Sequence, residues 1–140
     1  MAYSIARLTL YALLTAVESD LRDAIIANLS PKREVSEILP VKIYERARDR
    51  MERDRGFDPD LETKVLEYLD FSESIEVLQS HKSDLDGTLQ KAIRSIIQTS
   101  SEIALIRNRV MHSRPLEFDD FAKGSEFCKQ LLSFPTYPIS

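Results

Sequence analysis

The sequence predicts an all-α protein, a compact bundle of about five helices. Leucine, isoleucine, glutamate, arginine and alanine dominate, and only 3 of the 140 residues are glycine, which favours helix over sheet. Apolar residues recur at helical spacing along the chain, and no stretch shows the alternation of a strand. With 43% hydrophobic and 30% charged residues, the composition is that of a globular protein with an apolar core. We expect one helical domain over residues 1–134 and a tail over 135–140.

The first predicted helix spans residues 4–29 and ends at Ser30-Pro31. Its apolar residues recur at alternating steps of four and three, which places them on one face: Leu10, Leu14, Val17, Leu21 and Ala24. This continuous stripe predicts a central helix. The apolar run from Leu8 to Val17 has only 10 residues, too few to span a bilayer, so we expect no membrane association.

Three helical segments are predicted in the middle of the chain. The first, over residues 40–55, begins near Pro40, which suits a first helical turn, and ends before Gly56, a common helix stop. After the loop "FDPD", two shorter pieces follow over about 61–69 and 72–80.

The last third of the chain predicts three more segments. A helix over residues 85–98 is followed by "TSSE", which resembles a capping box with Thr99 as the cap and Glu102 at the third helical position. This pattern either starts a new helix or re-caps the previous one. The helical segment closes at Pro115, and a final helix spans 117–132. Its expected packing residues are Phe118, Phe121, Phe127, Cys128, Leu131 and Leu132.

Charge and cysteine content exclude several classes of protein. The net charge of −4 argues against a generally basic nucleic-acid coat, so any RNA contact needs a local basic patch. Cys128 is the only cysteine, which excludes an internal disulfide and a cysteine zinc cluster and predicts a cytoplasmic protein. The carboxylate pairs Asp58/Asp60 and Asp119/Asp120 lie in a loop and in a first helical turn, respectively. We expect neither a metal nor another cofactor.

The stretch "ALIRNRVMHSRP" carries the candidate catalytic residues Arg107, Asn108 and His112, spelled R-N-x3-H. Histidine exchanges a proton near neutral pH, since its free pKa is about 6.5. Arginine holds a phosphate through two parallel hydrogen bonds, and asparagine orients a hydroxyl or phosphate oxygen. Together these groups suit the attack of a ribose 2′-hydroxyl on its own 3′-phosphate, without a metal.

Ordinary structural roles are available to the same residues. A histidine at a helix end meets the terminal carbonyls, and an arginine beside the core pairs with a carboxylate. On an ideal helix Asn108 and His112 share one face with Leu105, whereas Arg107 falls within the apolar arc, roughly 140° from His112. Four explanations stay open: Arg107 is structural, its side chain wraps around, the helix ends before His112, or two chains complete the site.

A second set of arginines lies on the helix predicted over residues 40–55. Arg46, Arg50 and Arg53 share one face and are candidate contacts to RNA phosphates. Acidic residues are interleaved with them: Glu45, Asp49 and Glu52. This interleaving favours a solvated, salt-bridged face over an RNA-binding stripe.

An all-α domain of this size, with R-x4-6-H near the start of its closing helices and a polar residue after the arginine, resembles the HEPN superfamily. The segment "LIRNRVMHSRPLEFDDF" is especially similar to HEPN domains at the N-termini of larger bacterial NTPase or helicase proteins and in defence and stress systems. More loosely, "LYALLTAVESDLRDAI" resembles the opening helix of such domains, and the region from "DPDLE" to "SESIEVL" resembles their middle.

The resemblance implies a metal-independent endoribonuclease of a defence, stress or toxin-type system that acts as a homodimer, in which the motif helices of two protomers face a shared cleft. His112 would then be the acid/base or leaving-group stabiliser, Arg107 would hold the scissile phosphate or fix the geometry of the site, and Asn108 would position the ribose or phosphate. Arg109 and Arg114 are further candidate RNA contacts. Such a composite site would also remove the geometric conflict within one helix.

The alternative is a non-catalytic HEPN module that dimerises or binds RNA and docks a larger NTPase or helicase, or a partner antitoxin. A third interpretation gives the motif a purely structural role. An enzyme requires a solvent-accessible His112, whereas a docking module predicts an exposed apolar patch elsewhere on the bundle.

Overall fold

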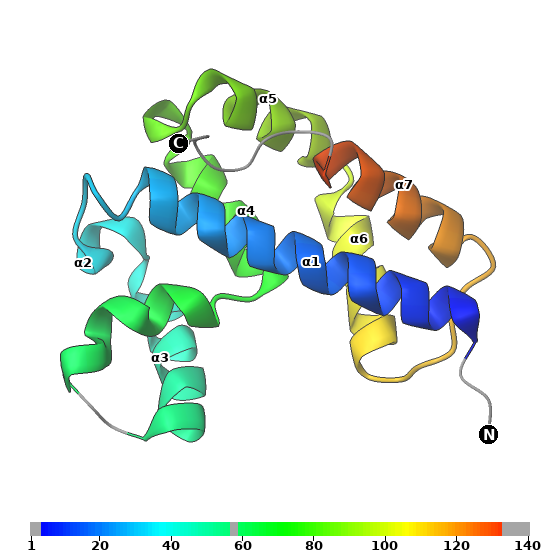
Figure 1. Ribbon diagram of the computed structural model, residues 1–140, viewed down its shortest axis with the longest axis horizontal. Coiled ribbons are helices and arrows are strands. Elements are labelled where there is room, and N and C mark those ends of the chain that lie inside the picture. The colour runs from blue at the N-terminus through cyan, green and yellow to red at the C-terminus, as the bar shows by residue number, and fades with distance from the viewer. Residues whose placement is uncertain (1–3, 57–58, 133–140) are drawn as a thin grey trace.

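The longest element is helix α1 (Ile5–Asn28), which runs the length of the molecule (Figure 1). This computed structural model describes residues 4–56 and 59–132, so the predicted tail over 135–140 lies outside the described residues. Ser4 caps α1 by accepting a hydrogen bond from the backbone N–H of Arg7 at 3.1 Å. The predicted apolar stripe of this helix is buried. No described helix combines the length and apolarity that crossing a membrane requires.

Two helices and a 3₁₀ segment lie near the C-terminal end of α1 (Figure 1): α2 (Val35–Ile38), α3 (Val41–Arg55) and η1 (Pro59–Tyr68). α2 is a single turn with a capping box between Glu34 and Glu37, and the sequence pattern did not predict it. α3 ends at Gly56, whose φ of 76° is the left-handed conformation that glycine adopts without strain.

The second half of the chain supplies the remaining elements: α4 (Phe71–Ser80), the 3₁₀ turn η2 (Lys82–Asp84), α5 (Gly87–Ile96), α6 (Ser100–Met111) and α7 (Asp120–Leu132). The all-α class is therefore confirmed, and the described residues contain no strand. They form seven α-helices rather than about five. Among the segments, α2 is the helix that was not predicted, and the piece predicted over about 61–69 is the 3₁₀ segment η1 rather than an α-helix.

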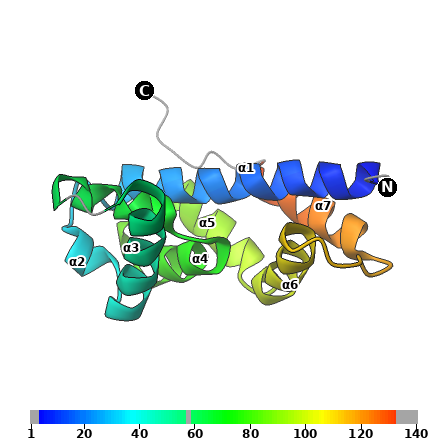
Figure 2. The same ribbon diagram turned by 90° about the horizontal axis from the view of Figure 1, so that it is seen from below.

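α1 packs against α4, α6, α7 and η1, and Figure 2 shows it along one side of the molecule with the other helices beneath it. It lies close to α7 at Gly124, where an added Cβ would lie 2.7 Å from Leu10 Cδ2. One face of α1 stays open to solvent and carries exposed apolar side chains: Ile5, Leu8 and Tyr11.

Two local predictions in this region are wrong. Thr99 does not form a capping box, because its backbone is already helical and its hydroxyl donates to the Ile96 carbonyl at 3.2 Å. Glu102 instead pairs with Lys123 of α7. Phe118 is fully exposed and Phe121 is 42% exposed, so neither is a core residue, whereas Phe127 is buried and packs edge-on against Phe71.

Candidate functional site

Helix α6 has one buried face and one exposed face. Ile103, Ile106 and Val110 enter the core, which follows from their helical spacing. The exposed residues Ser101, Leu105, Asn108 and His112 recur at steps of four, three and four and form a stripe on the outer side. We call these four residues the α6 stripe. The structure thus places two of the three motif residues, with the 59% exposed Leu105, on a surface that another molecule can reach.

His112 is the C-cap residue that directly follows α6 and is exposed. The chain turns immediately after it through Ser113, which has a φ of 53°. The backbone N–H of Arg114 donates to the Arg109 carbonyl at 2.8 Å, and that of Ser113 donates to the Val110 carbonyl at 3.4 Å. This pair of bonds is a Schellman motif, which fixes the backbone on both sides of His112.

Arg7 of α1 binds the terminal carbonyls of α6, which is the structural role that the sequence analysis considered for His112. Its guanidinium donates to the carbonyls of Arg109 at 3.2 Å and Val110 at 3.5 Å, and also to that of Arg114. A cation at a helix C-terminus satisfies terminal carbonyls and complements the helix dipole. Because Arg7 does this, the His112 ring makes no hydrogen bond or ion pair with another described residue. The contact joins residues more than 100 positions apart, and no local signal predicts it.

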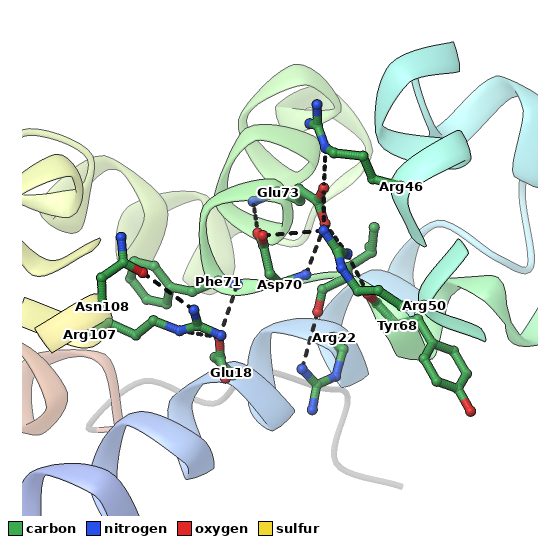
Figure 3. Close-up of polar contacts among 11 residues, drawn as sticks. Glu18, Arg22, Arg46, Arg50, Tyr68, Asp70, Phe71, Glu73, Arg107 and Asn108 are labelled. Atoms are coloured by element: carbon green, nitrogen blue, oxygen red, sulfur yellow. Dashed lines mark hydrogen bonds and ion pairs between the residues drawn. The ribbon is translucent and has the colours of Figure 1, made fainter. Parts of the chain in front are cut away.

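Arg107 lies outside the α6 stripe. Its side chain points toward α1, where it contacts Glu18 (Figure 3). Its Nε and Nη2 atoms lie 3.0 and 2.9 Å from Glu18 Oε1. The Glu18 side chain is only 10% exposed and also accepts the backbone N–H of Phe71 at 3.1 Å. The structural alternative, an arginine paired with a carboxylate beside the core, therefore describes the observed contact. The remaining nitrogen, Nη1, lies 3.4 Å from Asn108 Oδ1.

A polar cleft of about 350 Å³ lies between α1, α3, η1 and α6, in front of Arg107. We call it the arginine cleft. Three arginines from three helices line it: Arg22, Arg50 and Arg107. The lining also includes three carboxylates, Glu18, Glu67 and Asp70, and the apolar or aromatic residues Tyr68 and Leu69. Sequence analysis missed Arg22 and Glu18, which are one helical turn apart in the polar part of a long amphipathic helix.

Two of the three candidate RNA-binding arginines on α3 are held by a buried carboxylate of α4 (Figure 3). Arg46 donates to Glu73 at 2.9 Å, and Arg50 donates to Glu73 at 2.6 and 3.0 Å and to the Tyr68 carbonyl at 2.8 Å. Burial alone would raise the pKa of Glu73, but hydrogen bonds from Arg50, from the backbone of Asp70 and from Arg46 lower it. The expectation was a solvated face paired within the same helix. These two arginines are instead paired with a carboxylate of α4 and so connect α3 to α4.

The remaining candidate RNA contacts have different surroundings. Arg53 is exposed and lies 3.7 Å from Asp49 one turn earlier. Arg109 forms two hydrogen bonds, at 2.7 and 2.6 Å, with the buried carboxylate of Asp120. The Arg109 hydrogen bonds lower the pKa of Asp120. Arg114 is exposed beside His112.

A second hollow, an apolar groove of about 750 Å³, lies where α2 meets the start of α3. Its apolar lining includes Val35, Leu39, Val41 and Tyr44, and Val41 is 72% exposed. The groove is near the C-terminal end of α1, whereas the end of α6 is near the N-terminus of α1 (Figure 1). Among the described residues, no three histidine, cysteine or acidic side chains gather where they could hold a metal ion.

Comparisons of the chain with protein-family models, with curated proteins and with solved structures find no match. The HEPN resemblance thus rests on the residues of this sequence.

Proposed function

We propose that this protein is a metal-independent endoribonuclease of the HEPN type, acting as a homodimer in a defence, stress or toxin-type system. One observation carries the proposal. The His112 ring is exposed and unbonded at a rigid helix end, where Arg7 already satisfies the carbonyls that such a histidine would otherwise meet. A histidine without a structural role, one turn from Asn108 on an accessible stripe, suits proton transfer.

The proposed reaction is an internal transfer at phosphorus. The ribose 2′-oxygen forms a bond to the adjacent phosphorus, the bond to the 5′-oxygen of the next nucleotide breaks, and a 2′,3′-cyclic phosphate remains. A base takes the proton of the 2′-hydroxyl, and an acid returns a proton to the leaving oxygen; His112 serves one of these roles. Arg107 holds the phosphate and offsets its developing charge, while Asn108 orients the ribose or phosphate oxygens.

Two protomers supply this site in the proposal. Arg107 points toward α1 and Glu18, whereas His112 lies on the outer stripe of α6, so one chain directs the two groups to different sides. A second copy packed on the α6 stripe would bring its own His112 toward the arginine of the first. Leu105, 59% exposed in the middle of the stripe, provides an apolar contact for such a dimer.

The test is cleavage of an end-labelled structured RNA in EDTA by the wild-type protein and by His112→Ala and Arg107→Ala. We expect the wild type to cut and to leave 2′,3′-cyclic phosphate ends, identified by mass spectrometry. Each variant should lose at least about 100-fold in rate, because general acid–base catalysis and phosphate stabilisation each contribute at least this factor.

Arg94→Ala is the matched control, since it removes an exposed arginine of α5 that is not a candidate RNA contact. It should cut at the wild-type rate. Circular dichroism and sedimentation establish that all four proteins are folded and share one oligomeric state. A folded, dimeric wild type that leaves RNA intact contradicts the nuclease proposal.

A second candidate function is the non-catalytic docking module for a larger NTPase, a helicase or an antitoxin. The exposed apolar residues at steps of three on α1, Ile5, Leu8 and Tyr11, and the groove beside Val41 favour it. Under this alternative His112→Ala and Arg107→Ala have no effect on RNA, because the wild type does not cut it. The same cleavage assay therefore separates the two functions.

A further inference from the structure

The arginine cleft has balanced formal charge but unbalanced hydrogen-bonding capacity. Its lining contains Arg22, Arg50 and Arg107 against Glu18, Glu67 and Asp70. Charges that already face a partner have little capacity left for a ligand, so the contacts of each group decide what the cleft can bind.

Two of the three carboxylates already face protein donors. Glu18 accepts the backbone N–H of Phe71 and two nitrogens of Arg107, all at Oε1. Asp70 caps α4 by accepting the backbone N–H of Glu73 at 2.8 Å, and Arg50 lies 3.5 Å from its other oxygen. Glu67 is exposed and lies on η1. Its negative charge interacts with the positive charge of Arg55.

The three arginines of the cleft differ in how many of their N–H donors already have a protein partner. Arg50 is saturated by Glu73, Tyr68 and Asp70. Arg22, by contrast, makes one hydrogen bond, from Nη1 to the Leu69 carbonyl at 3.2 Å, and it has no carboxylate partner among the described residues. A guanidinium carries five N–H donors, so most of those of Arg22 stay available.

Arg22 and Arg107 lie on either side of Glu18 (Figure 3). Glu18 holds Nε and Nη2 of Arg107, so Nη1, with its long 3.4 Å contact to Asn108, faces away from this ion pair. The free donors of the cleft thus come from two guanidinium groups fixed by different helices, α1 and α6. Paired guanidinium groups with free donors match the oxygens of a phosphate.

We infer that the arginine cleft binds a backbone phosphate of single-stranded RNA between Arg22 and Arg107. This inference rests on the proposed function for the identity of the ligand, because that function places the scissile phosphate at Arg107; Arg22 is then a second contact to the same phosphate. Glu18 acts here as a positioning residue that directs Arg107 toward the phosphate. Arg50 and Glu73 form the rigid wall of the site.

Binding to a fluorescent RNA oligonucleotide with 2′-O-methyl groups throughout, which cannot be cleaved through its 2′-oxygens, tests the inference. Arg22→Gln should weaken binding about tenfold, the usual size of a lost charge-assisted hydrogen bond. The slope of log affinity against log salt should fall by about 0.7, which corresponds to one phosphate contact on a single strand. Arg22→Lys keeps the charge without the planar fork and should fall between Arg22→Gln and the wild type.

Arg94→Gln on α5 is the matched control, because it removes the same charge from an exposed position outside the cleft. It should bind within about twofold of the wild type. Equal losses of RNA affinity for Arg22→Gln and Arg94→Gln would mean that only net charge matters, which would overturn the site. Wild-type affinity of Arg22→Gln would also overturn it. Thermal unfolding establishes that both variants are folded.

The outcome is separable from that of the nuclease proposal. A wild type that binds this RNA through Arg22 but never cuts natural RNA supports the phosphate site and contradicts the nuclease. A wild type that cuts while Arg22→Gln binds and cuts equally well supports the nuclease and overturns the phosphate site.

Discussion

At the residue scale, the 12 arginines of the chain look alike in the sequence but differ in their partners. Arg7 binds helix-end carbonyls, Arg50 and Arg109 bind buried carboxylates, and Arg22 has donors left for a ligand. An arginine bound to a buried carboxylate stabilises the fold, because removing it leaves an uncompensated charge. Arg109, a candidate RNA contact by its position next to the motif, has its guanidinium occupied in this way.

Arg109→Ala is expected to lower the free energy of unfolding by about 3 kcal/mol at neutral pH, since it strands the Asp120 carboxylate, whose side chain is 2% exposed. Urea unfolding followed by circular dichroism measures this. Arg53→Ala, which removes an exposed i,i+4 pair, should change stability by less than about 0.5 kcal/mol. Equal, small effects of the two substitutions would contradict the structural role of Arg109.

The same comparison has an expected pH dependence. The Arg109 hydrogen bonds lower the pKa of Asp120 from its ordinary 3.8, so the stability from this pair is present above that value and is lost as pH falls through the lower folded-state pKa. The stability difference between the wild type and Arg109→Ala should therefore be largest at neutral pH and shrink below about pH 4. A difference that stays constant into acid would show that the pair is not ionic.

At the element scale, the end of α6 is the best-determined part of the candidate site. The Schellman bonds and the Arg7 contacts hold the backbone from Arg109 to Arg114 from two sides. The one strained residue is Ser113, whose φ of 53° is a conformation that glycine adopts freely and other residues do not.

Ser113→Gly is expected to stabilise the protein by about 1 kcal/mol, because relief of the left-handed strain exceeds the extra flexibility of glycine in the unfolded chain. Thermal or urea unfolding measures the change. Ser101→Gly is the matched control: it introduces glycine at a helical position of the same α6 stripe and should destabilise by about 0.5 kcal/mol. A loss of stability in both variants would mean that the turn is not strained.

At the scale of the whole molecule, α1 organises the candidate site. Its N-terminal turn supplies Arg7 to the end of α6, and its middle supplies Glu18 and Arg22 to the arginine cleft. Arg107 therefore belongs to the side of the molecule that α1 covers, whereas His112 belongs to the open side of α6. This division is the reason for our proposal that two copies of the chain share the site.

Mixing inactive His112→Ala with inactive Arg107→Ala is expected to restore cleavage if the two groups act across a dimer. Each mixed dimer then has one site with both an intact Arg107 and an intact His112, so activity should recover to roughly a quarter of the wild-type value under random exchange of subunits. Mixing either variant with itself provides the control. Recovery only on covalent tethering would indicate slow exchange, and inactivity even of tethered mixed dimers would place both groups in one chain.

The sequence alone predicted the features of this protein that depend on neighbouring residues. The all-α class, the long first helix, the stop at Gly56 and the start of a new helix near Ser100 all follow from helical periodicity and terminal residues, because the interactions that produce them span three or four positions. The local prediction failed at Thr99, whose backbone is already helical and whose hydroxyl donates to the Ile96 carbonyl instead of capping α6.

Only the tertiary structure decided which polar residues face one another. Glu18 and Arg107 are 89 positions apart and Arg7 and Arg109 are 102 positions apart, and no periodic pattern links such pairs. The motif identified Arg107 and His112 as candidates. It did not predict that Arg107 pairs with Glu18 of α1, or that the His112 ring has no partner among the described residues. The reason is physical: helix formation depends on local backbone geometry, whereas the partner of a charged side chain depends on which helices the apolar core brings together.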